Sequence, residues 1–86
     1  MIVFEQGTIN KRLPGIVEEI KNSGYTVTEV IEAEGVYDAC VSIAGDYDIQ
    51  ICNDGMICLT QWNHLEHDYD YLVESDDIQK VLGGVV

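Results

Sequence analysis

The histidines and cysteines of this 86-residue chain are the residue types that most often carry metal or nucleophilic chemistry. His64 and His67 stand three residues apart, and two histidines at that spacing on a helix can share one metal ion, which Cys52 or Cys58 would help to hold. The chain has no CxxC pair, and the histidines lack the i, i+4 spacing of the zinc-protease helix. We therefore expect two solvated histidines in a loop, no bound metal and no cofactor.

The three cysteines, Cys40, Cys52 and Cys58, suggest thiol chemistry. Cys58 with His64 would form a nucleophile–base pair, but a reactive thiol needs a positive environment, and the surrounding carboxylates would raise its pKa. Cys52 and Cys58 flank a turn symmetrically and are expected to face each other as small buried thiols, close enough to pair if oxidised. We expect no catalytic residue and no native disulfide. The alternative to a non-catalytic protein is a small metal-binding or thiol-dependent enzyme domain that uses Cys58, His64 and His67.

Other catalytic signatures are missing from the sequence. It contains no Gly-rich phosphate loop, no Ser–His–Asp signature and no nucleotide fingerprint. The pairs Asp46/Asp48 and Asp68/Asp70 offer oxygen ligands for Mg²⁺ or Ca²⁺, but no EF-hand spacing is present. We interpret both pairs as acids on a solvated strand face.

Acidity is the strongest signal in the sequence. Sixteen Asp and Glu face four Lys and Arg, and between Asn22 and Gln79 thirteen acidic residues occur without a basic one. Nucleic acid and anionic membrane both require a basic footprint, so neither is expected as a direct ligand. Solubility needs a net charge of about −2 to −8, whereas this chain carries −12. This excess of negative charge favours binding to a basic partner. The other interpretation is a structural or assembly protein whose acidity serves solubility alone.

The helices that must position these groups follow from apolar residues at helical spacing, namely Ile9, Leu13, Ile16, Val17 and Ile20. Because Pro14 is awkward inside a helix, we expect the regular part to span residues 13–23 with Pro14 in its first turn. A short final helix is expected over residues 76–82, with Ser75 as its cap.

From Tyr25 onward the apolar period changes to two, which is the period of β-strands. The predicted strands are residues 27–33, 36–43, 46–52 and 56–62, with 69–74 as a further edge strand. Residues 53–55, Asn-Asp-Gly, are a strong hairpin signal because these residue types tolerate positive φ. We predict one acidic α+β domain over residues 1–86. It would be a three- to four-stranded antiparallel β-meander with an N-terminal helix packed on one face and a short C-terminal helix.

Acidic residues recur at i and i+2 in or near these strands, where they would project from one face about 6.6 Å apart. The pairs are Glu32/Glu34, Asp46/Asp48 and Asp68/Asp70. Such rows resemble the charge spacing of a nucleic-acid backbone, and interleaved aromatic residues such as Trp62 and Tyr37 either anchor an interface or pack in the core. The candidate partner-binding residues are Glu32, Glu34, Asp46, Asp48, Asp54, Glu66, Asp68, Asp70, Tyr69 and Tyr71.

A resemblance to a known family lies in three parts of the chain: residues 20–22 followed by 25–27, the turn at 53–55, and the acidic residues after that turn. In them the chain resembles a small acidic phage-encoded anti-CRISPR protein of the nucleic-acid-mimic type. One such family inhibits a type II effector nuclease and combines a helix, a three-stranded antiparallel sheet and further helix. The resemblance implies a non-catalytic inhibitor. It would bind a basic, nucleic-acid-binding surface of a host defence (CRISPR–Cas) protein or ribonucleoprotein complex through an acidic face, as a DNA mimic.

The start of the chain indicates a location. Residues 1–5 have neither a basic region nor a long apolar core, so no signal peptide is expected, and no apolar run approaches transmembrane length. With an odd number of cysteines, this favours a cytoplasmic protein with reduced thiols, in the host cytoplasm if it is phage-encoded.

Overall fold

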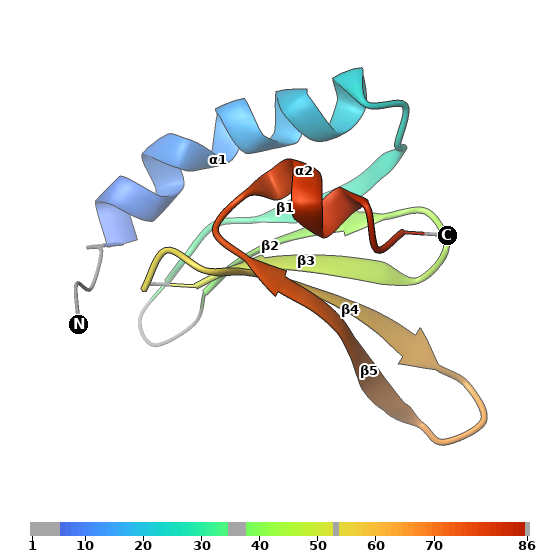
Figure 1. Ribbon diagram of the computed structural model, residues 1–86. Coiled ribbons are helices and arrows are strands. Elements are labelled where there is room, and N and C mark those ends of the chain that lie inside the picture. Colours follow the sequence, from blue (N-terminus) through green and yellow to red (C-terminus); the bar gives the residue numbers. More distant parts are fainter. Residues whose placement is uncertain (1–5, 35–37, 53, 86) are drawn as a thin grey trace.

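The computed structural model describes residues 6–34, 38–52 and 54–85 (Figure 1). The elements are α1 (Gln6–Asn22), β1 (Val27–Ile31), β2 (Ala39–Ile43), β3 (Tyr47–Ile51), β4 (Ile57–Asn63), β5 (Asp68–Ser75) and α2 (Ile78–Leu82). The predicted α+β class is confirmed, with an antiparallel meander between an N-terminal helix and a short C-terminal one.

Helix α1 is longer than its predicted range of residues 13–23, because it begins at Gln6 and contains Pro14 in its interior. The prediction was wrong because burial of the apolar stripe along the whole helix outweighs the hydrogen bond that Pro14 removes within it. Ile9 is 1% exposed and Ile20 is 0% exposed. Asn10 also exchanges two side-chain hydrogen bonds with the backbone of Ala33, which ties the helix to the chain beyond β1.

The sheet follows the chain order β1-β2-β3-β4-β5, and each neighbouring pair is antiparallel. Within the described residues it has five strands, one more than the upper limit of the predicted three to four, because both β1 and β5 pair as edge strands. At the predicted hairpin turn, Gly55 has a φ of 89° and the Asp54 carboxylate accepts a 3.0 Å hydrogen bond from the Met56 amide. Asn53, the first residue of that signal, lies outside the described residues.

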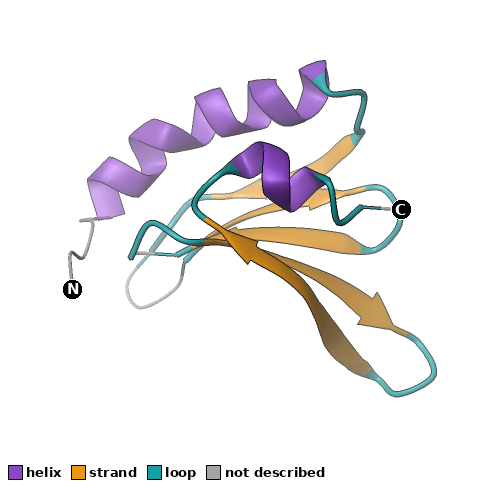
Figure 2. Ribbon diagram, viewed as in Figure 1, coloured by secondary structure: helices purple, strands orange, loops and turns teal. Residues whose placement is uncertain are grey.

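Cross-strand pairing assigns the side chains to two faces, because directly paired residues project to the same side of a sheet. Val41, Ile49 and Leu59 form a row across the central strands, and each is 0% exposed. Both helices pack against this core face (Figure 2). In the described part of the chain no helix covers the opposite face, which we call the open face. Its side chains are Glu29, Ile31, Cys40, Ser42, Asp48, Gln50, Cys58, Thr60, Trp62, Tyr69, Tyr71 and Glu74.

Helix α2 starts two residues later than predicted, and its cap is Asp77 rather than Ser75. The Asp77 carboxylate accepts a 2.9 Å hydrogen bond from the Gln79 amide, while the Ser75 hydroxyl accepts one from the Asp77 amide. Ser75 still belongs to β5, so the first polar side chain free to cap lies further along. Neither α1 nor α2 has the length and apolar composition that a membrane span requires.

Candidate functional site

The Lys and Arg side chains are confined to one of the two layers of the molecule, the helix layer. Lys11, Arg12 and Lys21 lie in α1 and Lys80 lies in α2, so all four Lys and Arg belong to the helices. Residues 23–75, which include the whole sheet, carry eleven Asp and Glu and no Lys or Arg. The sheet layer is therefore the source of the negative field of this protein.

A polar row crosses the open face from β1 to β5. Its members pair in turn and are Glu29, Ser42, Asp48, Thr60 and Tyr71. The Ser42 hydroxyl donates a 2.6 Å hydrogen bond to the Asp48 carboxylate, and the Thr60 hydroxyl donates a 3.5 Å bond to the Asp48 carbonyl. Asp48 is thus held from β2 on one side and from β4 on the other.

Two adjoining hollows occupy the open face, and they share Ser42, Asp48 and Tyr69. We call the combined depression the trough. One side is formed by β1 with Glu29, the other by β5 with Tyr69 and Tyr71, and Asp48 lies on the floor between them. Among the described residues that line the trough there is no Lys, Arg or His. A cation would therefore meet carboxylates there without a competing positive group.

Aromatic side chains form one wall of the trough. The rings of Trp62 and Tyr69 meet edge to face, with centroids 5.0 Å apart and an interplanar angle of 68°. Tyr69 is 46% exposed and Tyr71 is 80% exposed, so both predicted binding tyrosines face solvent. Tyr47, by contrast, is a core residue, and Tyr37 lies outside the described residues.

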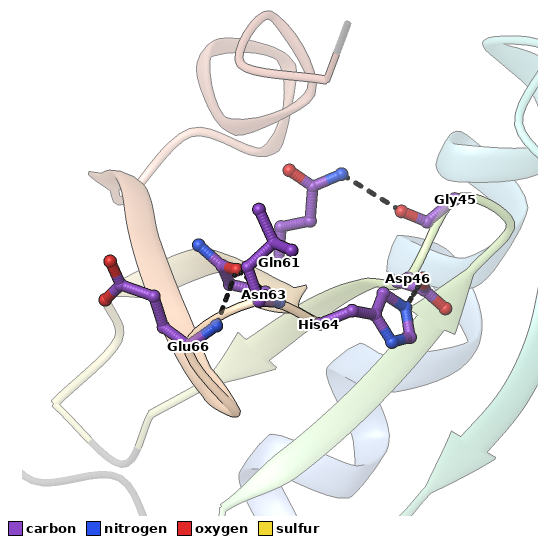
Figure 3. A network of polar contacts seen from close by, with 7 residues as sticks. Gly45, Asp46, Gln61, Asn63, His64 and Glu66 are labelled. Carbon is purple, nitrogen blue, oxygen red and sulfur yellow. Dashed lines mark hydrogen bonds and ion pairs between the residues drawn. The ribbon is translucent and has the colours of Figure 1, made fainter.

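The turns that follow β2 and β4 meet at one end of the sheet, and we call residues 44–46 and 64–67 the hairpin end. The His64 ring lies 2.7 Å from the Asp46 carboxylate, and Gln61 donates a 3.1 Å hydrogen bond to the Gly45 carbonyl (Figure 3). The Asn63 side-chain oxygen accepts from the amides of residues 65 and 66, which shapes the second turn. These contacts hold the side chain of Asp46 and the backbone of Glu66, and both residues are exposed.

The predicted acidic residues do not form a single patch. Asp48 lies on the open face, whereas Asp68 and Asp70 project from the opposite face of β5, because they pair with Asn63 and Gln61. Asp46 and Glu66 belong to the hairpin end, while Asp54 lies in the turn at the other end of β3 and β4. Glu32 and Glu34 follow the end of β1 and are exposed.

The expected i, i+2 arrangement within one strand therefore holds for one of the three acidic pairs. Asp68 and Asp70 both belong to β5. Asp46 lies in a turn with a φ of 65°, so it does not share a strand with Asp48. Both residues of the pair Glu32/Glu34 lie beyond the last residue of β1.

The thiols face each other as predicted, with the sulfur atoms of Cys52 and Cys58 3.9 Å apart, and both cysteines are free. Burial, and after it the nearby Asp48 carboxylate, raise the pKa of Cys40 to about 11. Burial likewise raises the pKa of Cys52 to about 12 and raises the pKa of Cys58. These thiols therefore carry little thiolate at neutral pH.

The residues of the alternative enzyme site lie far apart. Cys58 and His64 are six residues apart along and just beyond β4, which corresponds to about 20 Å at roughly 3.3 Å per residue. His64 and His67 belong to a turn rather than a helix and are both exposed. Within the described residues, no three His, Cys, Asp or Glu side chains are grouped closely enough to hold a metal ion.

Three members of the polar row, Glu29, Ser42 and Thr60, were not among the site residues predicted from the sequence. Ser42 alternates with buried residues along β2, so strand periodicity is a signal that identifies its face, whereas Thr60 is itself buried and interrupts the alternation in β4. Glu29 was not predictable in this way, because a bulge between Val27 and Glu29 reverses the face of the side chains along β1.

No family model, curated protein or solved structure matches this chain. The charge, the hydrogen bonds and the shape of the sheet layer are accordingly the basis on which a function is assigned.

Proposed function

We propose that this chain is a non-catalytic protein that binds a basic, nucleic-acid-binding surface of a partner protein or ribonucleoprotein complex. By occupying that surface it excludes the nucleic acid. The observation that carries the proposal is the separation of charge, since the sheet segment has eleven acidic and no Lys or Arg residues while every Lys and Arg lies in the helices. A surface of one sign attracts the opposite sign over distances comparable to the Debye length.

The order of the sheet layer supports this proposal. Asp68 and Asp70 stand about 6.6 Å apart along β5, and Asp46 and Glu66 add carboxylates at the adjoining hairpin end. The Asp46 carboxylate contacts the His64 ring at hydrogen-bond distance, and the Asp70 carboxylate accepts a hydrogen bond from the Asn63 side chain. Charges fixed in this way lose less conformational freedom on binding than charges on a mobile chain.

The finer part of the proposal concerns the target. The resemblance of residues 20–22, 25–27 and 53–55, and of the acids after them, to nucleic-acid-mimic inhibitors favours a host defence complex of the CRISPR–Cas class as the target. The chain would then act as a phage-encoded inhibitor in the host cytoplasm. In that role the acidic side chains take the place of the phosphates that the complex would otherwise bind.

The proposal is tested by capture followed by displacement. The immobilised chain is exposed to nuclease-treated bacterial lysate, and retained proteins are eluted with rising salt and identified by mass spectrometry. Each purified candidate is then mixed with a labelled oligonucleotide, and the free chain is added. We expect a basic nucleic-acid-binding protein to be retained, and the free chain to release its oligonucleotide in proportion to the chain added.

A double variant of the helix layer, Glu18→Lys with Glu19→Lys, is the control for net charge. It should release the oligonucleotide nearly as well as the unmodified chain. Should the retained protein hold its oligonucleotide at saturating concentrations of the chain, the proposed exclusion of nucleic acid is wrong.

A further inference from the structure

We propose that the trough on the open face is a docking groove for an extended, arginine-bearing segment of the partner, with one guanidinium group bound to Asp48 beside the ring of Tyr69. This inference rests on the proposed function, because it takes the partner to be basic. It adds the place on this chain where the partner binds, the trough, and the partner side chain that binds there, an arginine.

The lining of the trough sets the chemistry of its occupant. Glu29, Asp46 and Asp48 contribute three carboxylates, and no Lys, Arg or His is among the described lining residues. An apolar segment would remove these charged groups from water without supplying an opposite charge, which is costly, and an acidic segment would be repelled. A cationic side chain satisfies them.

The neighbours of Asp48 favour arginine over lysine. Ser42 donates to one oxygen of the carboxylate at 2.6 Å and thereby fixes its orientation for a planar, two-pronged donor. Trp62 and Tyr69 offer aromatic surface at the same place, with their rings packed edge to face. Guanidinium groups stack on aromatic rings and are more weakly hydrated than ammonium groups, so they lose less on entering such a groove.

The dimensions of the trough favour an extended segment. It runs from Glu29 on β1 to Tyr71 on β5, which is the full width of the sheet. Four strand spacings of about 4.8 Å correspond to about 19 Å, the length of roughly six extended residues at about 3.3 Å each. A hexapeptide can therefore span the trough and place one arginine over Asp48.

The charge of this chain disfavours a second copy as the occupant. Each copy carries a net charge of −12, and the charged side chains among the described lining residues of the trough are all carboxylates. Bringing two such troughs together would add like-charge repulsion. A partner that supplies arginines offsets this charge.

The test is a titration of the full-length, ¹⁵N-labelled chain with capped hexapeptides, followed by amide chemical shifts. One peptide alternates arginine and threonine, and its counterpart replaces arginine with lysine. We expect shifts concentrated at Ser42, Asp48, Thr60 and Tyr69, and about threefold tighter binding of the arginine peptide. Shifts located on α1 or spread evenly over the acidic surface, or equal affinity for the two peptides, would overturn the proposal.

Asp48→Asn is the key variant, because asparagine keeps an oxygen that accepts from Ser42 and therefore preserves the fold. It should weaken the arginine peptide about fivefold or more. Glu18→Gln is the matched control, since it removes one negative charge from an exposed position of α1, in the helix layer, and should change the affinity less than about twofold. Equal losses in the two variants would mean that the peptide responds to net charge alone.

Tyr69→Val keeps a residue type suited to a strand and removes the ring. It should reduce the preference for arginine over lysine, and an unchanged preference would contradict the role of the ring. Sedimentation of the free chain tests for a second copy as the occupant. Dimers that Tyr69→Val abolishes would show that the groove holds a second copy, and the proposal would be wrong.

The outcomes separate this inference from the function on which it rests. If the peptide avoids the trough while the captured partner still loses its oligonucleotide to the chain, the docking groove is wrong and the proposed function stands. If the peptide binds the trough as expected but the partner retains its oligonucleotide, the groove stands and the exclusion of nucleic acid fails.

Discussion

Ser42 on β2 and Asp48 on β3 are direct cross-strand partners joined by a 2.6 Å hydrogen bond on the open face. The bond has two consequences. It satisfies one oxygen of a half-buried carboxylate within the fold, and it orients that carboxylate toward the trough. One interaction therefore contributes both to the stability of the sheet and to the geometry proposed for binding.

Ser42→Ala should lower the free energy of unfolding by about 1–2 kcal/mol, because the donor to a charged, half-buried group is lost. Asp48→Asn should cost less, since its side-chain oxygen still accepts the bond. Urea denaturation followed by circular dichroism measures both. A larger loss in Asp48→Asn than in Ser42→Ala would show that the charge, not the hydrogen bond, holds this pair.

Leu59 and Leu65 form a matched pair near the same hairpin, since Leu59 is 0% exposed and Leu65 is 93% exposed. Leu59→Ala should lower the free energy of unfolding by about 2–5 kcal/mol, because a cavity opens between the sheet and the helices. Leu65→Ala should change it by less than about 0.5 kcal/mol. Thermal or urea denaturation of both variants provides the comparison, and a similar loss in both would contradict the assigned core.

Gly84 and Gly15 should respond to alanine in opposite directions. A Cβ at Gly84 would collide with the Val73 side chain and approach Leu59 to 3.0 Å, whereas nothing lies within 4 Å of a Cβ at Gly15. Gly84→Ala should therefore destabilise the fold by about 1–3 kcal/mol. Gly15→Ala should stabilise α1 by about 0.5–1 kcal/mol, because alanine loses less backbone entropy in a helix. Melting temperatures that shift in the same direction would be inconsistent with this packing.

The raised pKa of Cys40 predicts a loss of stability at alkaline pH. The thiol is charged when deprotonated, so the unfolded chain, with a Cys pKa near 9.0, releases this proton before the folded chain, whose pKa is about 11. The contribution of the thiol is complete below about pH 9 and declines as the pH rises from 9 through about 11. The stability difference between the unmodified chain and Cys40→Ala should therefore be constant from pH 7 to about 8.5 and shrink by pH 10.

That difference cancels the titration of the lysines and tyrosines, which both proteins share. A difference that stays constant up to pH 10 would show that the Cys40 thiol is no more buried in the folded chain than in the unfolded one.

The sequence predicted most of the sheet, for reasons visible in particular residues. Tyr47, Ile49 and Ile51 alternate with polar residues, and they became the buried side of β3 because a strand with one buried face must alternate. Gly55 supplied the positive φ that the predicted turn requires. Helix α1 was predicted too short because proline disfavours a helix interior, where it lacks the N–H for a backbone hydrogen bond. Burial of Ile9, in the first turns of the helix, outweighs the loss of that bond at Pro14.

The candidate site was harder to predict, because its geometry depends on irregularities in the strands. A bulge in β1 brings Glu29 to the open face, and a second irregularity, between Leu59 and Thr60, aligns Tyr71 with Thr60. The two-residue period of a strand does not show where a bulge inserts an extra residue and shifts the alternation. Asp68 and Asp70 were correctly expected on one face of a strand, but which face they occupy followed from their pairing with β4.

The most direct test of the central claim, that function resides in the carboxylates of the sheet layer, is the Kd for the captured partner at low and high salt. Each close carboxylate–Arg or carboxylate–Lys pair contributes about 1–3 kcal/mol, so Glu29→Lys with Glu74→Lys should raise the Kd by tens- to thousands-fold. Raising the salt should weaken the unmodified chain, and Cys58→Ala or His64→Ala should change little.

The result that would contradict the claim is equally definite. If single reversals at each candidate acid leave the Kd unchanged, or if Glu18→Lys with Glu19→Lys in α1 raises it as much as the double variant of the sheet, the acidity of the sheet is a solvated surface and not a binding site. The positions for single reversal are Glu29, Glu32, Glu34, Asp46, Asp48, Asp54, Glu66, Asp68, Asp70 and Glu74.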